Sequence, residues 1–256
     1  MRPKTHITGA GFRVVKANGY KTTGYNPGGT TADLRQTVQH HDNKPWSGAA
    51  WSIVKKKSLK ASEQERPDVA QKREFWKEDI TVIDNKRFVF IDESGAKTNM
   101  TRLYGRAFGG NRVVDSVPHG HWNTTTMVAA VGATGARAPF VFEGAMDAEM
   151  FCAYVKKVLV PELNAGDIVV MDNLQCHKNA YARKLIEEVD AQVWYLPAYS
   201  PDYNPIEKMW SKIKAFIRKV GARTQELLYK AIADALSTIT QSDIHGWFKS
   251  CGYNIL

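Results

Sequence analysis

The sequence predicts an α/β protein in which helices cover a mixed β-sheet, and three patterns support that prediction. From Lys86 onward, short strand-like runs alternate with helical patterns. The run Ile168–Met171 is apolar on both faces and too short for a helix, which is typical of a buried strand. From Pro205 to Val220, apolar residues recur every three to four positions, which predicts an amphipathic helix.

The bulk composition is that of a soluble globular protein large enough for one sizeable core. Of its 256 residues, 43% are hydrophobic and 24% are charged. Its three cysteines lie far apart without CxxC spacing, so neither a disulfide framework nor a thiolate zinc site is expected. The N-terminus has no apolar signal region, and no run approaches the roughly 18 apolar residues of a membrane helix. We therefore expect no membrane partner.

The excess positive charge lies at the N-terminal end of the chain. The net charge is +9, and residues 1–60 hold 11 Lys and Arg against 2 Asp and Glu. Lys55, Lys56 and Lys57 form a basic cluster. A basic arm of this kind is typical of proteins that bind nucleic acid, and the alternative is a solvated tail.

The predicted elements divide the chain into four parts. Residues 1–60 are basic and largely irregular, with one short helix near 32–41, and residues 61–85 form a linker helix that starts near Pro67. Residues 86–240 form the α/β domain, and residues 241–256 form a C-terminal tail. Within the domain, the expected elements are a strand at 87–94, a hairpin at 101–114 turning at Gly109–Gly110, two strands within 123–144 turning at 134–137, a helix at 147–163 capped by Asp147, a strand at 168–172, a helix at 180–189, a strand at 192–197, and helices at 205–220 and 224–239.

Three carboxylates stand where such a sheet places functional side chains. Asp92 lies near the end of the first strand, Asp172 ends the strand Ile168–Met171, and Glu207 lies in the first turn of the helix at Pro205. Sites in open α/β sheets gather at the carboxyl ends of strands. If the two strands are neighbours, Asp92 and Asp172 converge there. Glu93, on the opposite strand face, and Asp202, in a loop, are competing acids.

Clustered carboxylates repel one another, and a divalent cation removes that cost. Oxygen ligands favour Mg²⁺ or Mn²⁺, and two such ions can activate a water or hydroxyl for attack on a phosphodiester. The cluster therefore points to metal-dependent chemistry on a nucleic-acid backbone.

Each acid also has a purely structural interpretation. Asp172 could cap a turn, and Asp92 could form a side-chain turn before "SGAK". With Asn204 as N-cap and Pro205 at the first helical position, Glu207 could complete a capping box.

Four motifs in order resemble one family. "VFIDESG", "HGHWNTTT", "VVMDNLQCHK" and "YSPDYNPIEKMWSKIK" resemble the catalytic core of the mariner-type superfamily of DDE transposases, in its bacterial insertion-sequence branch. The resemblance runs from about Lys55 to the C-terminus, and 34 residues separate Asp172 from Glu207, as is characteristic of the superfamily. It implies an RNase H-like, five-stranded mixed sheet flanked by helices. It also implies that Asp92, Asp172 and Glu207 are the catalytic, metal-binding triad.

The same resemblance implies an activity and its partners. With two Mg²⁺ or Mn²⁺ ions, such an enzyme hydrolyses phosphodiesters at transposon ends and transfers the freed strand into target DNA. Its partner is double-stranded DNA, bound by a homodimer, in the bacterial cytoplasm at the nucleoid. Relatives carry helix-turn-helix modules in front of the core, whereas residues 1–60 lack a convincing pair of helices and form a truncated or atypical DNA-binding region. The alternative function is an inactive or truncated remnant that still binds DNA.

Several basic side chains are candidates for contact with DNA. His177 and Lys178 follow Asp172 closely, although they could simply begin the next helix. Lys208 and Lys212 lie on the helix that starts at the proposed site, where the alternative is an ordinary solvated face. Lys55, Lys56 and Lys57 complete the predicted DNA-binding set.

Overall fold

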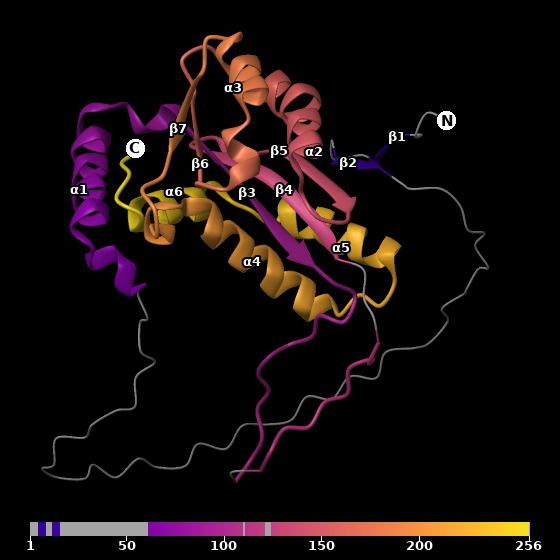
Figure 1. The fold of residues 1–256 in the computed structure, drawn as a ribbon. Coiled ribbons are helices and arrows are strands. Elements are labelled where there is room, and N and C mark those ends of the chain that lie inside the picture. Colours follow the sequence, from indigo (N-terminus) through magenta and orange to yellow (C-terminus); the bar gives the residue numbers. More distant parts are fainter. Residues whose placement is uncertain (1–4, 9–11, 16–60, 110, 121–123, 256) are drawn as a thin grey trace, which may run out of the picture. The chain divides into compact units, whose positions relative to one another are not determined.

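The computed structural model describes residues 5–8, 12–15, 61–109, 111–120 and 124–255, which form an α/β fold (Figure 1). The strands are β1 (Thr5–Thr8), β2 (Phe12–Val15), β3 (Phe88–Ala96), β4 (Thr125–Gly132), β5 (Gly135–Glu143), β6 (Ile168–Met171) and β7 (Gln192–Tyr195). The α-helices are α1 (Pro67–Val82), α2 (Ala148–Tyr154), α3 (Ala180–Glu187), α4 (Pro205–Val220), α5 (Gln225–Ser237) and α6 (Gln241–Ser250).

The sheet has the strand order β1-β2-β5-β4-β3-β6-β7. The five strands β5-β4-β3-β6-β7 form the predicted mixed sheet, in which β3 is antiparallel to β4 and parallel to β6. The hairpin of β1 and β2 extends the sheet beyond β5. The prediction that residues 1–60 are largely irregular did not include these two strands. The short helix predicted near 32–41 lies outside the described residues.

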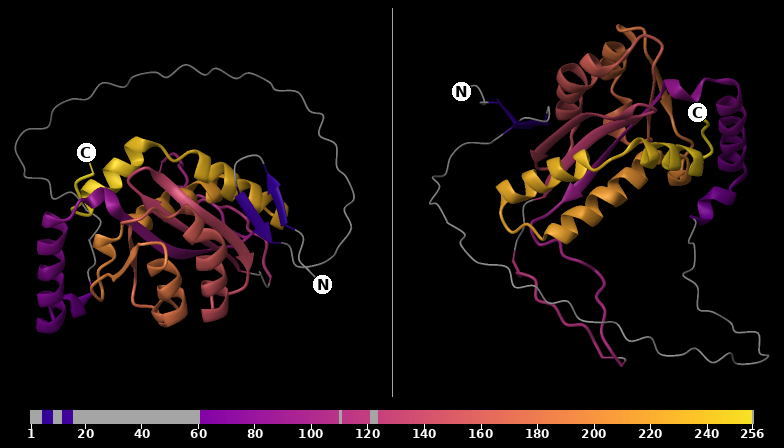
Figure 2. Two further views of the ribbon diagram at one scale, coloured as in Figure 1. Left: turned by 90° about the horizontal axis from the view of Figure 1, so that it is seen from above. Right: turned by 180° about the vertical axis from the view of Figure 1, so that it is seen from behind.

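Helices cover both faces of the sheet (Figure 2), and the side chains of β3 alternate between the two cores. Phe88 and Phe90 face the core that α1, α4, α5 and α6 cover. Val89 and Ile91 face the core under α2 and α3. This alternation confirms the predicted strand faces and places Asp92 on the side of α4.

Helices α1 and α6 pack into the core that contains Phe88 and Phe90. The prediction had made residues 61–85 a linker helix and residues 241–256 a tail. In α1, Trp76 and Ile80 are buried in that core. Helix α6 buries Phe248, and Tyr253 follows it into the core. Trp76 donates a hydrogen bond from Nε1 to the hydroxyl of Tyr253 at 3.0 Å, so α1 and the C-terminus lie side by side, as Figures 1 and 2 also show.

The connection between β3 and β4 is a long excursion that we call the arm (residues 101–120). The turn of the predicted hairpin is present, since Gly109 has φ +62° and the Asn111 amide donates to the Phe108 carbonyl. Its predicted strands are wrong: no strand is assigned among the described residues of the arm. The side chains of Leu103, Tyr104, Phe108 and Val114 are each at least 67% exposed. Without a core to cover their apolar side chains, the two limbs gain little from strand pairing.

The remaining elements follow the prediction closely. Asp147 caps α2 by accepting a hydrogen bond from the Met150 amide at 2.7 Å. The turn between β4 and β5 spans Gly132–Gly135, two residues earlier than the predicted Thr134–Arg137, because Gly132 pairs with Gly135. No helix of the described residues is long and apolar enough to cross a membrane.

Candidate active site

Strands β3 and β6 bring two of the predicted acids to the same edge of the sheet. The parallel register pairs Phe88 with Ile168 and Phe90 with Val170. Continued by two residues, this register places Asp92 beside Asp172, at the spacing of neighbouring strands, about 4.8 Å. The predicted convergence of these two side chains therefore follows from strand pairing.

Helix α4 brings the third acid. Its first turn carries Glu207, and its N-cap residue is Asn204, as predicted. The capping box, the alternative interpretation of Glu207, is absent: the Asn204 side chain makes no capping hydrogen bond, and the Glu207 amide donates to the Asn204 carbonyl at 3.3 Å. Because the carboxylate of Glu207 is exposed and not used as a cap, it is available to the site.

The three acids line one cleft. A cavity of about 410 Å³ has Asp92, Asp172 and Glu207 in its wall. The rest of the wall comes from the ends of β6 and β7 and from the loop that leads to α4: Asn173, Leu174, Leu196, Pro197, Ala198, Tyr199, Ser200, Pro201 and Asn204. A cleft of this kind, at the carboxyl edge of a sheet and open to solvent, is where a substrate backbone can approach all three carboxylates.

The carboxylates of the cleft affect one another's ionisation. Burial raises the pKa of Asp92 to about 7, and the negative charge of Glu207 adds to this effect. Glu93 and Asp172 contribute in the same direction, more weakly. At neutral pH, the Asp92 carboxylate is therefore partly protonated unless a bound cation offsets the negative charge of its neighbours.

His177 is held between two carboxylates. It donates from Nδ1 to Oδ1 of Asp172 at 2.7 Å and from Nε2 to Oε1 of Glu93 at 3.0 Å. Burial opposes the charged imidazolium, but these two hydrogen bonds outweigh it and raise the pKa of His177 to about 10. Burial raises the pKa of Asp172, but the bonds from His177 and the Leu174 amide outweigh it and lower that pKa overall.

The predicted contact of His177 with DNA is wrong. The residue is 1% exposed, and its ring packs 4.7 Å from that of Phe151. Both ring nitrogens are used inside the protein. Its position fixes one oxygen of Asp172, while no hydrogen bond of the described residues occupies Oδ2.

The other predicted basic contacts differ in their surroundings. Lys178 is exposed beside Asp172, as a contact with a phosphate requires. Lys208 is half-buried beside Cys251. Lys212 donates to the Thr238 carbonyl and to Asp243, so its ammonium is engaged within the fold. Lys55, Lys56 and Lys57 lie outside the described residues.

The cleft suits a hard divalent cation in the chemistry of its donors. All three acids offer carboxylate oxygens, and Oδ1 of Asn204 is buried without a hydrogen-bond partner in the wall of the same cleft. Within the described ranges, no three His, Cys, Asp or Glu side chains already converge as a ligand set. The residues therefore match the ion in chemical type and line one cleft, without being drawn together as a ligand set.

Two functional features were not predicted from the sequence. Glu93 was placed on the other face of β3, yet its side chain reaches His177 and thereby acts on Asp172. Arg73 of α1 binds the loop before α4 through Asp202, which lies 129 positions further along the sequence. The motif "IDES" places Glu93 next to Asp92 and could have indicated its role, whereas no sequence pattern indicated the contact of Arg73 with the loop.

The mixed sheet with helices on both faces defines an RNase H-like α/β domain, and three acids line the cleft at its carboxyl edge. The family profile of the DDE superfamily endonucleases matches residues 87–228, more than half of the sequence. The chain belongs to that family.

Solved structures of the Mos1 mariner transposase share the fold. The Mos1 paired-end complex with the left transposon end has a TM-score of 0.64 at 13% identity, over 78% of this chain and 63% of that one. The paired-end complex with Mg has a TM-score of 0.63 at 14% identity, over 80% and 65%. The Mos1 catalytic domain has a TM-score of 0.53 at 14% identity, over 75% and 93%. The chain thus spans less than two thirds of the Mos1 chains in these two complexes. No curated protein matches it.

Proposed function

We propose that this chain is the catalytic part of a DNA transposase that cuts phosphodiesters at transposon ends and joins the freed strand to target DNA. The observation that carries the proposal is the single cleft lined by Asp92, Asp172 and Glu207. The family profile and the Mos1 fold support it. We assign the three acids as the catalytic residues.

In this proposal the three carboxylates hold two Mg²⁺ or Mn²⁺ ions. When bound, such ions activate a water or 3′-hydroxyl nucleophile and stabilise the leaving oxygen. His177 keeps Oδ1 of Asp172 fixed, which leaves Oδ2 for the site. The open cleft admits the DNA backbone, and the exposed Lys178 stands beside it to bind a phosphate.

The wider setting is part of the same proposal. We infer double-stranded DNA as partner, with Lys55, Lys56 and Lys57 adding sequence-independent contacts, because of the basic N-terminal charge. A homodimer would pair two transposon ends, as suggested by the paired-end complexes of Mos1. The four sequence motifs support placement in the bacterial insertion-sequence branch, acting in the cytoplasm on nucleoid DNA.

A plasmid assay tests the proposal. A supercoiled plasmid carrying the DNA that flanks the gene is incubated with the protein and Mg²⁺ or Mn²⁺. We expect nicking and strand transfer by the wild type, their loss with EDTA, and a drop of about a thousandfold or more for Asp172→Asn, since metal-assisted charge stabilisation contributes several kcal/mol.

The matched control is Asp234→Asn, which removes an exposed carboxylate on α5, outside the cleft. It should keep full activity. A wild type that binds the plasmid but never nicks it would favour the inactive DNA-binding remnant. Equal nicking by Asp172→Asn and wild type would exclude the assigned site.

A further inference from the structure

The loop between β7 and α4 supplies much of the cleft wall and leads directly to Glu207. Residues 197–201 and Asn204 line the cavity, and Glu207 follows Tyr203 by four residues. A displacement of this loop therefore moves the start of α4 and the carboxylate that it carries. Whatever fixes the loop also fixes the third acid of the site.

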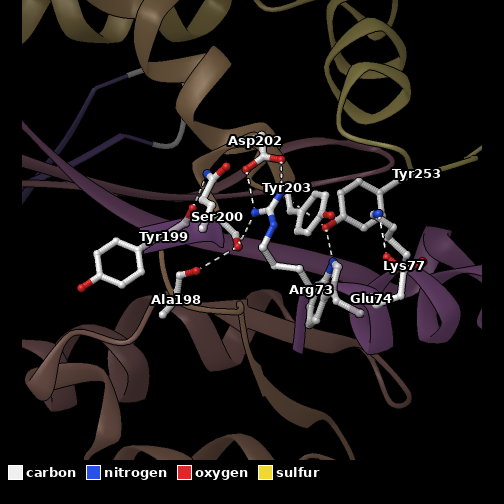
Figure 3. Close-up of polar contacts among 11 residues, drawn as sticks. Arg73, Glu74, Lys77, Ala198, Tyr199, Ser200, Asp202, Tyr203 and Tyr253 are labelled. Carbon is white, nitrogen blue, oxygen red and sulfur yellow. Dashed lines mark hydrogen bonds and ion pairs between the residues drawn. The ribbon is translucent and has the colours of Figure 1, made fainter. Parts of the chain in front are cut away.

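Arg73 of α1 binds this loop through both terminal nitrogens of its guanidinium (Figure 3). Nη1 donates to Oγ of Ser200 at 2.6 Å and to Oδ1 of Asp202 at 3.0 Å, and Nη2 donates to Oδ2 of Asp202 at 2.7 Å. The guanidinium carbon lies 4.4 Å from the ring centre of Tyr203. Three residues of the loop are thus bound by a single side chain.

This contact differs from an ordinary surface ion pair. The Arg73 side chain is only 15% exposed, against 50% for Asp202, and its two-pronged contact with Asp202 has the geometry in which arginine is hardest to replace. By contrast, Arg183 and Glu187 pair on α3 with side chains 55% and 47% exposed. Pairs of that exposed kind contribute little.

Two further contacts hold the loop from the same side. Gln64, just before α1, donates from Nε2 to the Tyr199 carbonyl at 2.6 Å. The hydroxyl of Tyr253, which accepts from Trp76 of α1, donates to the Tyr203 carbonyl at 2.7 Å. Tyr199 itself has φ +56°, a left-handed conformation that a non-glycine residue keeps only where its surroundings impose it.

We propose that Arg73 is a positioning residue: it fixes the loop Ala198–Asn204 and so sets where the Glu207 carboxylate stands in the cleft. The inference rests on the proposed function and assigns a role to α1, which lies outside the matched residues 87–228. Displacement of a reacting group by about 1 Å can cost as much as 100-fold in rate.

The experiment compares Arg73→Met, Arg73→Lys and Asp202→Asn with the matched control Arg183→Met. For each folded variant, the nicking assay gives kcat, KM for DNA and the Mn²⁺ concentration at half-maximal rate. We expect Arg73→Met to lower kcat roughly 10- to 100-fold and to raise the Mn²⁺ requirement, with KM little changed. Arg73→Lys should recover only part of the rate, because an ammonium cannot form the two-pronged contact.

A merely structural role would predict something else. If folded Arg73→Met keeps the wild-type kcat and Mn²⁺ requirement, or if Arg183→Met loses as much activity, the positioning role is wrong. The double variant Arg73→Met/Asp202→Asn should be no slower than the slower single variant, since each substitution breaks the same Arg73–Asp202 contact. Additive losses would overturn the pairing.

Hydrogen exchange separates failure of this inference from failure of the proposed function. If the wild type shows no nicking, the proposed function fails, but the effect of Arg73 on the loop Ala198–Asn204 can still be measured. Arg73→Met should then speed amide exchange in residues 199–207 at least tenfold while leaving α3 unchanged. Unchanged exchange in that segment would overturn the role of Arg73 whatever the activity.

Discussion

Two long connections leave the same sheet and are held in opposite ways. The loop Ala198–Asn204 is bound by Arg73, Gln64 and Tyr253, all from outside the loop. The described residues of the arm make no hydrogen bond to the rest of the fold; Arg223 binds only the carbonyls of Thr98 and Met100 at its root. The loop's conformation is therefore imposed by contacts from distant parts of the chain, and that of the arm is not.

The largest expected difference between the two regions concerns catalysis. Glu207→Gln keeps the shape of the side chain and removes its charge, so nicking should fall about a thousandfold. The melting temperature should stay nearly constant, because Glu207 takes no part in a capping box. The arm offers a matched control in Asp115→Asn, which should nick as the wild type does. Lost stability in Glu207→Gln would show that the charge of Glu207 contributes to the fold.

A second difference concerns stability. Tyr253→Phe leaves the Trp76 indole and the Tyr203 carbonyl without their partner, and burial of both should lower the free energy of unfolding by about 1–3 kcal/mol. Tyr104→Phe, at an arm position 85% exposed, should change it by less than about 0.5 kcal/mol. Urea unfolding of both variants measures the contrast, and equal losses would contradict it.

A third difference concerns local opening. Chymotrypsin cuts after aromatic residues, and both regions carry them: Tyr104 and Phe108 are 85% and 95% exposed in the arm, and Tyr199 is 46% exposed in the loop. We expect the first cut in the arm, because a protease needs a segment that can leave the surface. Mass spectrometry of early fragments identifies the site. A first cut after Tyr199 would reverse the comparison.

The smallest effect concerns the far side of α4, where Lys212 binds Asp243 of α6. Hydrogen bonds from Lys212 and Thr240 lower the pKa of Asp243 to about 2 from an ordinary value of 3.8. A lowered carboxyl pKa stabilises the fold above the ordinary value, and this contribution is lost as pH falls toward 2. The stability difference between wild type and Lys212→Met should thus be below about 1 kcal/mol at pH 7 and shrink between pH 4 and 2. A difference that is constant over this range would contradict the assignment.

The parts of the fold that could be predicted depend on local patterns. The run Ile168–Met171 and the alternation in β3 predicted two strands that end near Asp92 and Asp172. That the strands are neighbours was a condition of the predicted convergence, and the parallel pairing of β3 with β6 meets it. Helix α6 was missed although its signal was present: Thr240 and Asp243 form a capping box.

Other features depend on contacts that sequence spacing does not encode. The burial of His177 depends on Phe151 and Glu93, which come from two other elements. The arm has apolar residues typical of strands but no core to cover them. The absence of a capping bond at Asn204 is a matter of side-chain orientation, which the Asn-Pro-x-Glu pattern leaves open.

The aromatic packing around Phe88 has a consequence for how this domain can be inherited. Phe88 opens β3 at the edge of the segment that matches the family profile, and its ring packs against those of Trp76 and Tyr253. One of these rings precedes that segment and the other follows it. A gene fusion or truncation that keeps only residues 87–228 would therefore remove the two rings that pack on the strand bearing Asp92. The unit that must be inherited together is therefore longer than residues 87–228: it includes the segments on both sides that carry Trp76 and Tyr253.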